Sequence, residues 1–189
     1  MNKKNKDLEI QNFPKVEINF SPKNPVIPKI ADKTKIDVRY CLIAPFAYAH
    51  IYWDQSIMEV VYDVEEPKLD TAERQYREEL TTAMKDLINY DIIVGKSDEE
   101  LEAYIERNIK ILAIELGMDF SYESYRKIFY YLSRDFMGFN DVEPLLRDYF
   151  IEDIECNGAN AQIFVVHRAF RNLKTNIMFK HLYNLASFV

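Results

Sequence analysis

Glycine is scarce in this chain, which has four glycines among 189 residues. Loops that hold nucleotide phosphates through backbone N–H groups usually cluster several glycines, because the backbone must approach the ligand closely. Here Gly95, Gly117, Gly138 and Gly158 are far apart, and each stands where a helix or a strand is expected to end. The scarcity of glycine argues against a phosphate-binding loop within this chain.

Residues 92–97 (IIVGKS) nevertheless resemble the end of such a loop. A complete loop needs a glycine five residues before Gly95, and Tyr90 stands there. Ser97 is better explained as the first residue of a capping box with Glu100, at the start of a helix. No other Gly-Lys-Ser or Gly-Lys-Thr occurs, so we expect the isolated chain not to be an ATPase.

The chain has two cysteines, Cys41 and Cys156, and no apolar run of the roughly 20 residues that a membrane-spanning helix needs. Its first residues do not resemble a signal peptide. We expect reduced, mostly buried thiols in a cytosolic protein, with a disulfide or a metal site as the alternatives. The histidines His50, His167 and His181 are too scattered in the sequence to indicate a metal site, so none is expected.

Positive charge is also in short supply, since 24 Lys and Arg stand against 31 Asp and Glu, for a net charge of -7. Nucleic acids and acidic membranes are bound by clustered basic side chains, so this composition disfavours both. The aromatic residues between Tyr40 and Tyr62 could stack on bases, but half-buried strands favour aromatics anyway and no basic stripe accompanies them. No nucleic-acid partner is expected.

The pattern of the chain predicts an α+β fold that begins with an extended, proline-rich arm over residues 1–35. Alternating apolar residues predict a small antiparallel sheet over residues 36–64. Three helices follow and form a bundle, with starts at Asp70 (paired with Glu73), Ser97 and Ser121 and an end at Gly138. We expect residues 36–138 to form one domain.

A helix with a small sheet is expected in residues 139–189, the start of an α/β domain. Glu143 and Pro144 suit the first turn of a short helix entered at Asp141. Residues 151–156 alternate apolar and charged side chains, which is typical of a strand. Two further strand-like runs follow the break at Gly158, and the first of them ends in His167 and Arg168.

Several blocks of sequence stand out, in this order: residues 44–52 (APFAYAHIY), 61–69 (VYDVEEPKL), 143–148 (EPLLRD), 151–154 (IEDI), the turn at Gly158, the His167-Arg168 pair and residues 175–179 (TNIMF). Together they resemble the amino-terminal region of archaeal secretion-type ATPases, the motors of type IV pili, archaella and type II secretion. The resemblance covers roughly residue 40 to the end of the chain, and it departs from the family at Tyr149, where proline is common, and at Arg171, near which a glycine is common.

The resemblance implies a non-catalytic amino-terminal domain of a cytoplasmic assembly motor, which reaches the membrane only through its partners. The implied partners are the carboxyl-terminal ATPase domain, neighbouring subunits of the hexamer and the inner-membrane platform protein of the machine. ATP and Mg²⁺ would be bound by the catalytic domain of the full-length parent, with no cofactor held by this chain. The amino-terminal domain would cover that nucleotide.

The resemblance further implies that basic side chains of this region contact the nucleotide phosphates; the candidates are Arg168, in the matching His167-Arg168 pair, and Arg171 just beyond it. An arginine can meet phosphate oxygens through two N–H donors at once. The alternative for Arg168 is a surface pair with a carboxylate. The alternative function is a free-standing interaction adaptor with the same fold. The apolar run at Leu182, Leu185 and Phe188 has no helix stop, however, and this favours a chain that continues into another domain.

Overall fold

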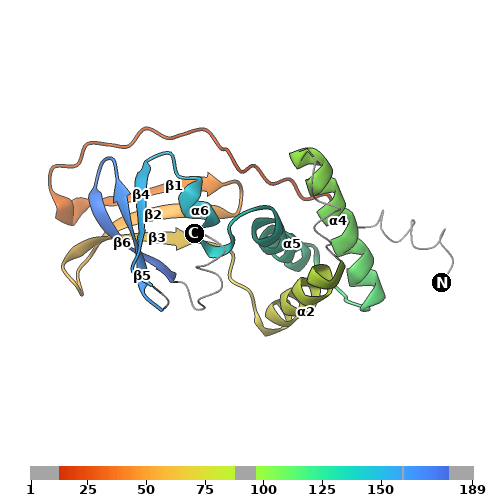
Figure 1. Cartoon of the computed structure of the whole chain (residues 1–189). Helices are drawn as coiled ribbons and strands as arrows, with labels where there is room; N and C mark the ends of the chain where they lie inside the picture. Colours follow the sequence, from red (N-terminus) through yellow and green to blue (C-terminus); the bar gives the residue numbers. More distant parts are fainter. Residues whose placement is uncertain (1–12, 88–96, 159, 179–189) are drawn as a thin grey trace. The chain divides into compact units, whose positions relative to one another are not determined.

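The computed structural model describes residues 13–87, 97–158 and 160–178. The chain divides into two compact units: a helical unit (Met1–Glu17 and Lys68–Gly138) and a sheet unit (Ile18–Pro67 and Phe139–Val189). Figure 1 shows the elements of each. Several features considered in the sequence lie outside the described residues: the start of the arm, residues 92–96, His181, Leu182, Leu185 and Phe188.

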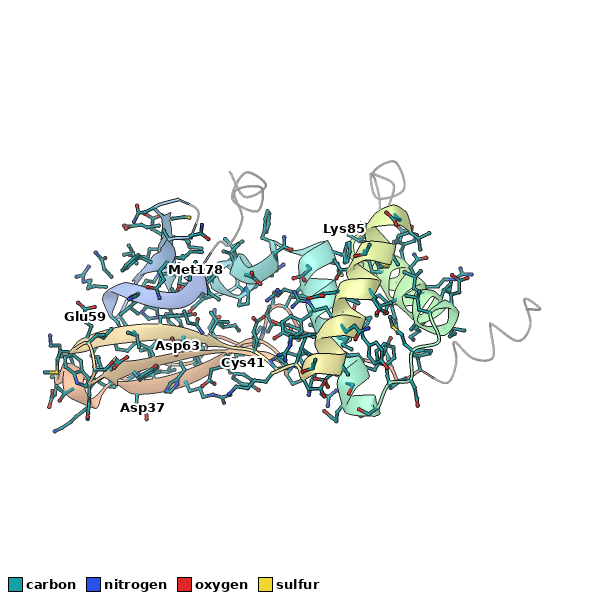
Figure 2. All side chains as sticks on the ribbon, turned by 90° about the horizontal axis from the view of Figure 1, so that it is seen from below. Asp37, Cys41, Glu59, Asp63, Lys85 and Met178 are labelled. Atoms are coloured by element: carbon teal, nitrogen blue, oxygen red, sulfur yellow. The ribbon has the colours of Figure 1, made fainter. Side chains whose placement is uncertain are left out.

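The sheet unit contains one six-stranded sheet with the order β1-β2-β3-β6-β5-β4. Neighbouring strands are antiparallel except at the centre, where β3 and β6 run parallel, with Val61 opposite Lys174 and Tyr62 opposite Thr175. Figure 2 labels Asp37, Glu59 and Met178 on three of these strands. The strands are β1 (Asp37–Ile43), β2 (Ala47–Asp54), β3 (Glu59–Glu65), β4 (Ile151–Cys156), β5 (Gln162–His167) and β6 (Arg171–Met178).

The parallel pairing of β3 with β6 is extended by a side-chain amide. Asn176 Oδ1 accepts the backbone N–H of Val64 at 2.9 Å, and its Nδ2 donates to the Val64 carbonyl at 3.0 Å. These bonds join the two small sheets that the sequence predicts separately. The sequence predicts one domain over residues 36–138 and the start of another from residue 139. In the structure, the strands of residues 36–65 belong with residues 139–178, and the helices form a unit of their own.

Two short helical elements precede β4 in the sheet unit, η2 (Asn140–Val142) and α6 (Glu143–Leu146). Pro144 lies in the first turn, where its missing N–H leaves no helical bond unmade. The Glu143 side chain is buried and accepts the Phe139 N–H at 2.8 Å and the Arg147 Nε–H at 2.5 Å. The short helix predicted from Asp141 is confirmed.

The helical unit packs three helices against one another: α2 (Thr71–Leu87), α4 (Asp98–Glu115) and α5 (Tyr122–Met137). The predicted starts are confirmed, because Asp70 and Glu73 exchange hydrogen bonds and Ser97 and Glu100 form a capping box. Gly117 ends α4 at φ 64°, and the bonds from Gly117 N to Ile114 O and from Met118 N to Ala113 O complete a Schellman motif. The sequence signals therefore located the bundle.

A buried arginine lies at the end of α5. Arg134 is 1% exposed, and its Nη2 is 2.7 Å from Asp135 Oδ1. Arg77 of α2 donates to the other oxygen of Asp135 at 2.6 Å. The Asp135 carboxylate thus joins two helices through two cationic partners.

Part of the arm is described and follows an extended course up to the single-turn helix η1 (Lys33–Lys35). Asn19 and Ala44 exchange two backbone hydrogen bonds of 2.9 Å, an isolated bridge at the edge of the sheet unit. This is less than the edge strand that the alternation at residues 16–20 would allow. Among the described residues, no helix combines the length and the apolar character that crossing a bilayer requires.

Candidate functional site

The two arginines singled out in the sequence lie on one turn. β5 ends at His167 and β6 begins at Arg171, so Arg168 and Arg171 flank the reversal of the chain. We call residues 168–171 the arginine turn. The Arg168 N–H donates to the Phe150 carbonyl at 2.9 Å, which ties the turn to the residue before β4. Both side chains are therefore presented by one anchored segment.

Arg168 is only loosely paired with a carboxylate. Its Nε is 3.6 Å from Glu152 Oε1, and the two side chains are 45% and 52% exposed. An ion pair of this kind contributes only ~0–1 kcal/mol. The guanidinium also lies over the Tyr149 ring, 4.5 Å from its centroid, which restricts its orientation while leaving its donors accessible.

Arg171 is exposed and has a left-handed backbone conformation, with φ 67°. Glycine adopts such a φ without steric cost, whereas other residues incur roughly 1–2 kcal/mol. A glycine is common near this position in the family that the sequence resembles, and the conformation supplies a physical reason. Within the described part of the chain, Arg171 forms no ion pair.

A buried carboxylate anchors the segment that precedes β4. Asp148 Oδ2 accepts the hydroxyls of Tyr40 (2.5 Å) and Tyr62 (2.7 Å), which come from β1 and β3. Its Oδ1 accepts the Phe150 N–H at 2.8 Å. Asp148 is 5% exposed and Tyr62 is fully buried, so water does not replace these bonds. These bonds tie β1 and β3 to residues 148–150, and the Phe150 carbonyl in turn accepts the Arg168 N–H of the arginine turn.

His167 completes this Asp148 cluster, which consists of Tyr40, Tyr62, Asp148 and His167. His167 Nδ1 accepts the Ala169 N–H at 3.1 Å, so in the neutral ring the proton resides on Nε2, 3.2 Å from the Tyr40 hydroxyl. Burial lowers the pKa of His167, although the charges of Asp148 and Glu152 oppose the shift. The imidazole is therefore neutral at pH 7 and acts as a fixed hydrogen-bonding group.

The two tyrosines of the cluster remain protonated donors. Burial, with the nearby Asp148 charge, raises the pKa of Tyr40 and of Tyr62 well above the usual value. The four side chains of the cluster are at most 7% exposed and bond mainly to one another, although Asp148 also borders a cavity of about 320 Å³ next to β4. The chemistry of the cluster is structural: it holds His167, and hence the start of the arginine turn, in one geometry.

The sequence did not reveal this cluster. It indicated only that His167 stands at the end of a strand, whereas the structure shows the side chain to be fully buried. The signal that could have indicated the cluster is a tyrosine at an inward position of each of two strands, together with an aspartate just after a short helix. Phe150 and Phe170 then cover the imidazole, with ring centroids 5.6 and 5.1 Å away.

The other candidate groups are not brought to this site. His50 lies on β2 and contacts Asp37 at 2.8 Å and Glu65 at 3.3 Å. Cys41 and Cys156 are free and half-buried. Over residues 13–87, 97–158 and 160–178, no His, Cys, Asp and Glu side chains are grouped as metal ligands would be.

Comparison with known proteins adds one relative. No family model matches the chain. An uncharacterized protein of Methanocaldococcus jannaschii is 32% identical over 128 residues, which are 67% of this chain and 50% of that protein. The chain therefore spans about half the length of the curated relative that it matches.

Proposed function

We propose that this chain is a non-catalytic module that brings Arg168 and Arg171 to the phosphates of a nucleotide held by a partner domain. The setting would be that of the cytoplasmic secretion motors that the sequence resembles. The observation that supports this most strongly is the arginine turn itself: two arginines on a segment fixed by a buried cluster, with their donors accessible. Such preorganisation favours contacts to a ligand placed by another domain.

The ion pair with Glu152 does not prevent this role. At 3.6 Å between half-exposed groups it contributes ~0–1 kcal/mol, whereas a hydrogen bond to a charged group contributes about 1.5–3 kcal/mol. A phosphate presented to Arg168 would therefore displace Glu152. Tyr149 would keep the guanidinium plane in place during that exchange.

The two arginines are too few to hold a nucleotide alone. Contacts of about 1.5–3 kcal/mol each fall short of the roughly 8 kcal/mol that micromolar affinity requires. The nucleotide and its Mg²⁺ would be held by the carboxyl-terminal ATPase domain of a full-length motor. Neighbouring hexamer subunits and the inner-membrane platform protein would be the other partners.

The test is Arg168→Ala in a full-length motor that contains this chain. Loss of a charge-assisted contact should lower the ATPase turnover about 10- to 100-fold with little change in melting temperature. Arg39→Ala is the matched control, because Arg39 also pairs with a carboxylate, Glu65, and lies over a tyrosine ring, Tyr48. Turnover that is unchanged in Arg168→Ala, or lowered equally in both variants, would remove Arg168 from this role.

A second candidate is a free-standing interaction adaptor with the same fold. The archaeal relative is compatible with it, since the part of that protein outside the match is about as long as the 128 residues within it, the size of one modest domain. In an adaptor the arginine turn would contact an acidic surface of a partner. Arg168→Ala would then weaken partner capture equally with and without Mg-ATP, whereas the motor proposal predicts an effect that depends on nucleotide.

A further inference from the structure

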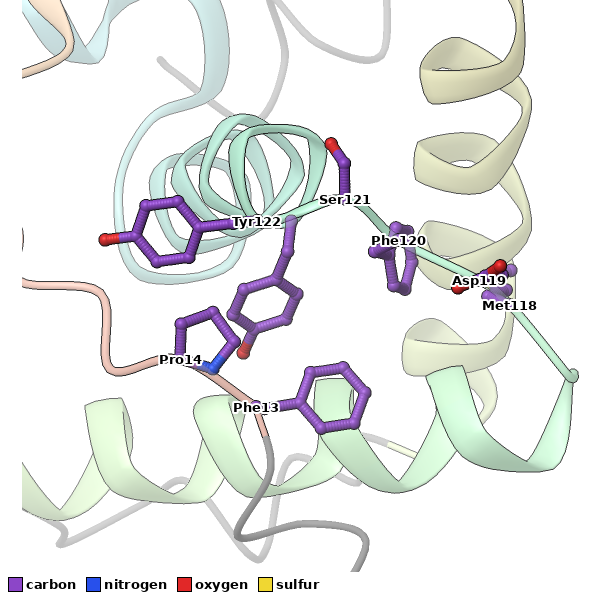
Figure 3. Close-up of a pocket in the computed structure, with 8 residues that line it drawn as sticks. Phe13, Pro14, Met118, Asp119, Phe120, Ser121 and Tyr122 are labelled. Carbon is purple, nitrogen blue, oxygen red and sulfur yellow. The ribbon is translucent and has the colours of Figure 1, made fainter.

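A second site lies in the helical unit, apart from the arginine turn. A cavity of about 390 Å³ opens between the arm and the segment that leads into α5. Figure 3 shows Phe13 and Pro14 of the arm on one side and Phe120, Ser121 and Tyr122 on the other. This volume is within the range of small-molecule sites in proteins.

Four of the eight residues that line this cavity are aromatic: Phe13, Phe120, Tyr122 and Tyr125. The Phe13 and Tyr125 rings are 5.1 Å apart and the Phe120 and Tyr125 rings 6.0 Å apart, so the three make one cluster. Tyr122 is 56% exposed and also lines the cavity. The face of each ring carries partial negative charge, which attracts cations.

One buried hydroxyl of the wall has no partner. Tyr125 is 1% exposed, and within the described residues its Oη makes no hydrogen bond. Burial and the charge of Glu106 raise the pKa of Tyr125, so the phenol stays neutral and its oxygen can accept a bond. An unsatisfied buried hydroxyl costs free energy, which a ligand that bonds to it would recover.

The remaining polar groups of the wall favour positive charge. Asp119 contributes an exposed carboxylate, and the Ser121 hydroxyl already accepts the Ser124 N–H at 3.0 Å. The eight residues that line the cavity include no Lys, Arg or His. Asp119 is therefore the one charged side chain among these eight residues, and its charge is negative.

Among the described residues, Lys15 and Arg126 each directly follow a wall residue in the chain, and both have other partners. Lys15 bonds to Glu17 at 2.9 Å. Arg126 pairs with Glu123 at 3.2 Å and lies over the Tyr122 ring, 5.5 Å from its centroid. Arg126 therefore occupies one face of the Tyr122 ring, and the other rings of the wall supply most of the attraction for a cation.

We propose that the aromatic cavity formed by Phe13, Phe120, Tyr122 and Tyr125, with Asp119 in its wall, binds an organic ammonium cation. This site is independent of the arginine turn and of the proposed function. The ring faces attract the cation, the Asp119 carboxylate neutralises it, and the Tyr125 oxygen accepts a hydrogen bond from a donor on the ligand. A free small cation and a lysine side chain of a partner share this chemistry.

The test uses a pair of probes of equal shape. Choline and its uncharged isostere 3,3-dimethylbutan-1-ol are titrated into the chain, with the ¹³C-labelled methyl group of Met118, a wall residue, as the reporter in nuclear magnetic resonance spectra. Choline should bind about tenfold more tightly than the isostere. Equal affinity for the two, or no saturable shift with choline, would overturn the proposal. N-acetyl-lysine methylamide is the third probe: tighter binding than choline assigns the site to a lysine side chain, and weaker binding to a free cation.

Two variants test the assigned groups. Asp119→Asn should lower choline affinity about 3- to 10-fold, and Tyr125→Phe should lower it by a similar factor while keeping the ring. Glu78→Gln removes the same charge from an exposed residue of α2 outside the cavity wall and should leave the affinity unchanged. A loss in Glu78→Gln equal to that in Asp119→Asn would show a general charge effect and overturn the assignment.

Discussion

Two carboxylates, one in the sheet unit and one in the helical unit, are satisfied by different donors. In the sheet unit, the buried Asp148 accepts two tyrosine hydroxyls and one backbone N–H, all of them neutral. In the helical unit, Asp135, whose side chain is 11% exposed, is bound by Arg77 and Arg134, both cationic. The arginines that bind Asp135 are thus structural, whereas Arg168 of the arginine turn is only loosely paired with a carboxylate.

The two arrangements also differ in how far along the chain the partners lie. Arg134 is the neighbour of Asp135, and Arg77 lies 58 residues before it, on α2. The donors to Asp148 come from two strands that lie 108 and 86 residues away. The Asp148 cluster therefore forms only when the whole sheet has assembled, which makes it a device for fixing the arginine turn.

The largest effect is expected from Asp148→Ala. It leaves the hydroxyls of Tyr40 and Tyr62 and the Phe150 N–H without an acceptor in a buried site, at roughly 1–3 kcal/mol each, so the sheet unit should lose about 4 kcal/mol. Urea unfolding followed by fluorescence measures this, because Trp53 on β2 is the sole tryptophan. Glu155→Ala, at an exposed position of β4, is the control and should stay within about 0.5 kcal/mol. A loss below about 1 kcal/mol for Asp148→Ala would show that the cluster does not hold the sheet unit.

A smaller effect is expected from Asp135→Ala in the helical unit. Removing one partner of a buried ion pair costs about 3 kcal/mol, and Arg134 is 1% exposed. Unfolding followed by far-ultraviolet circular dichroism reports on the helices. Asp86→Ala, an exposed position of α2, is the matched control. If Asp135→Ala and Asp86→Ala lowered the free energy of unfolding by the same small amount, the contrast between the carboxylates of the two units would fail.

The smallest effect concerns pH and should appear in the sheet unit. The pKa of His167 is lowered by burial, so below the usual value of about 6.5 the unfolded chain takes up a proton that the folded state does not. Stability should therefore fall as the pH drops below about 6.5 and level off below the folded pKa. Residues 68–138 contain no histidine, so this cause cannot act in the helical unit.

Trp53 fluorescence during urea unfolding at pH values above and below about 6.5 measures this dependence. His167→Gln should reduce this dependence. An unchanged pH dependence in His167→Gln would assign the effect to other groups.

Local structure was predictable because its causes lie within a few residues. The caps at Asp70, Ser97 and Ser121 and the Gly117 stop occupy the ends of the observed helices. Strand β4 runs over the residues that the alternation indicated. These signals depend on side chains that bond to backbone three residues away or less, and the sequence displays them directly.

Long-range structure was not predictable in the same way. The pairing of β3 with β6 joins Val61 to Lys174, and no local pattern specifies which strands meet. The same holds for Asp148, whose neighbours in sequence say nothing of Tyr40 and Tyr62. Arg168 and Arg171 could be located on a turn from the sequence, but the anchoring of that turn by a buried cluster required the fold.

The most direct test of the central proposal is a calorimetric titration of the purified chain with Mg-ATP. Two arginines of about 1.5–3 kcal/mol each cannot supply the roughly 8 kcal/mol of micromolar binding, so the chain alone should give no saturable heat in that range. Addition of the complete ATPase domain should restore nucleotide binding that is sensitive to Arg168→Ala. A saturable micromolar isotherm with the chain alone would contradict the account, because it would show a nucleotide site complete within this chain.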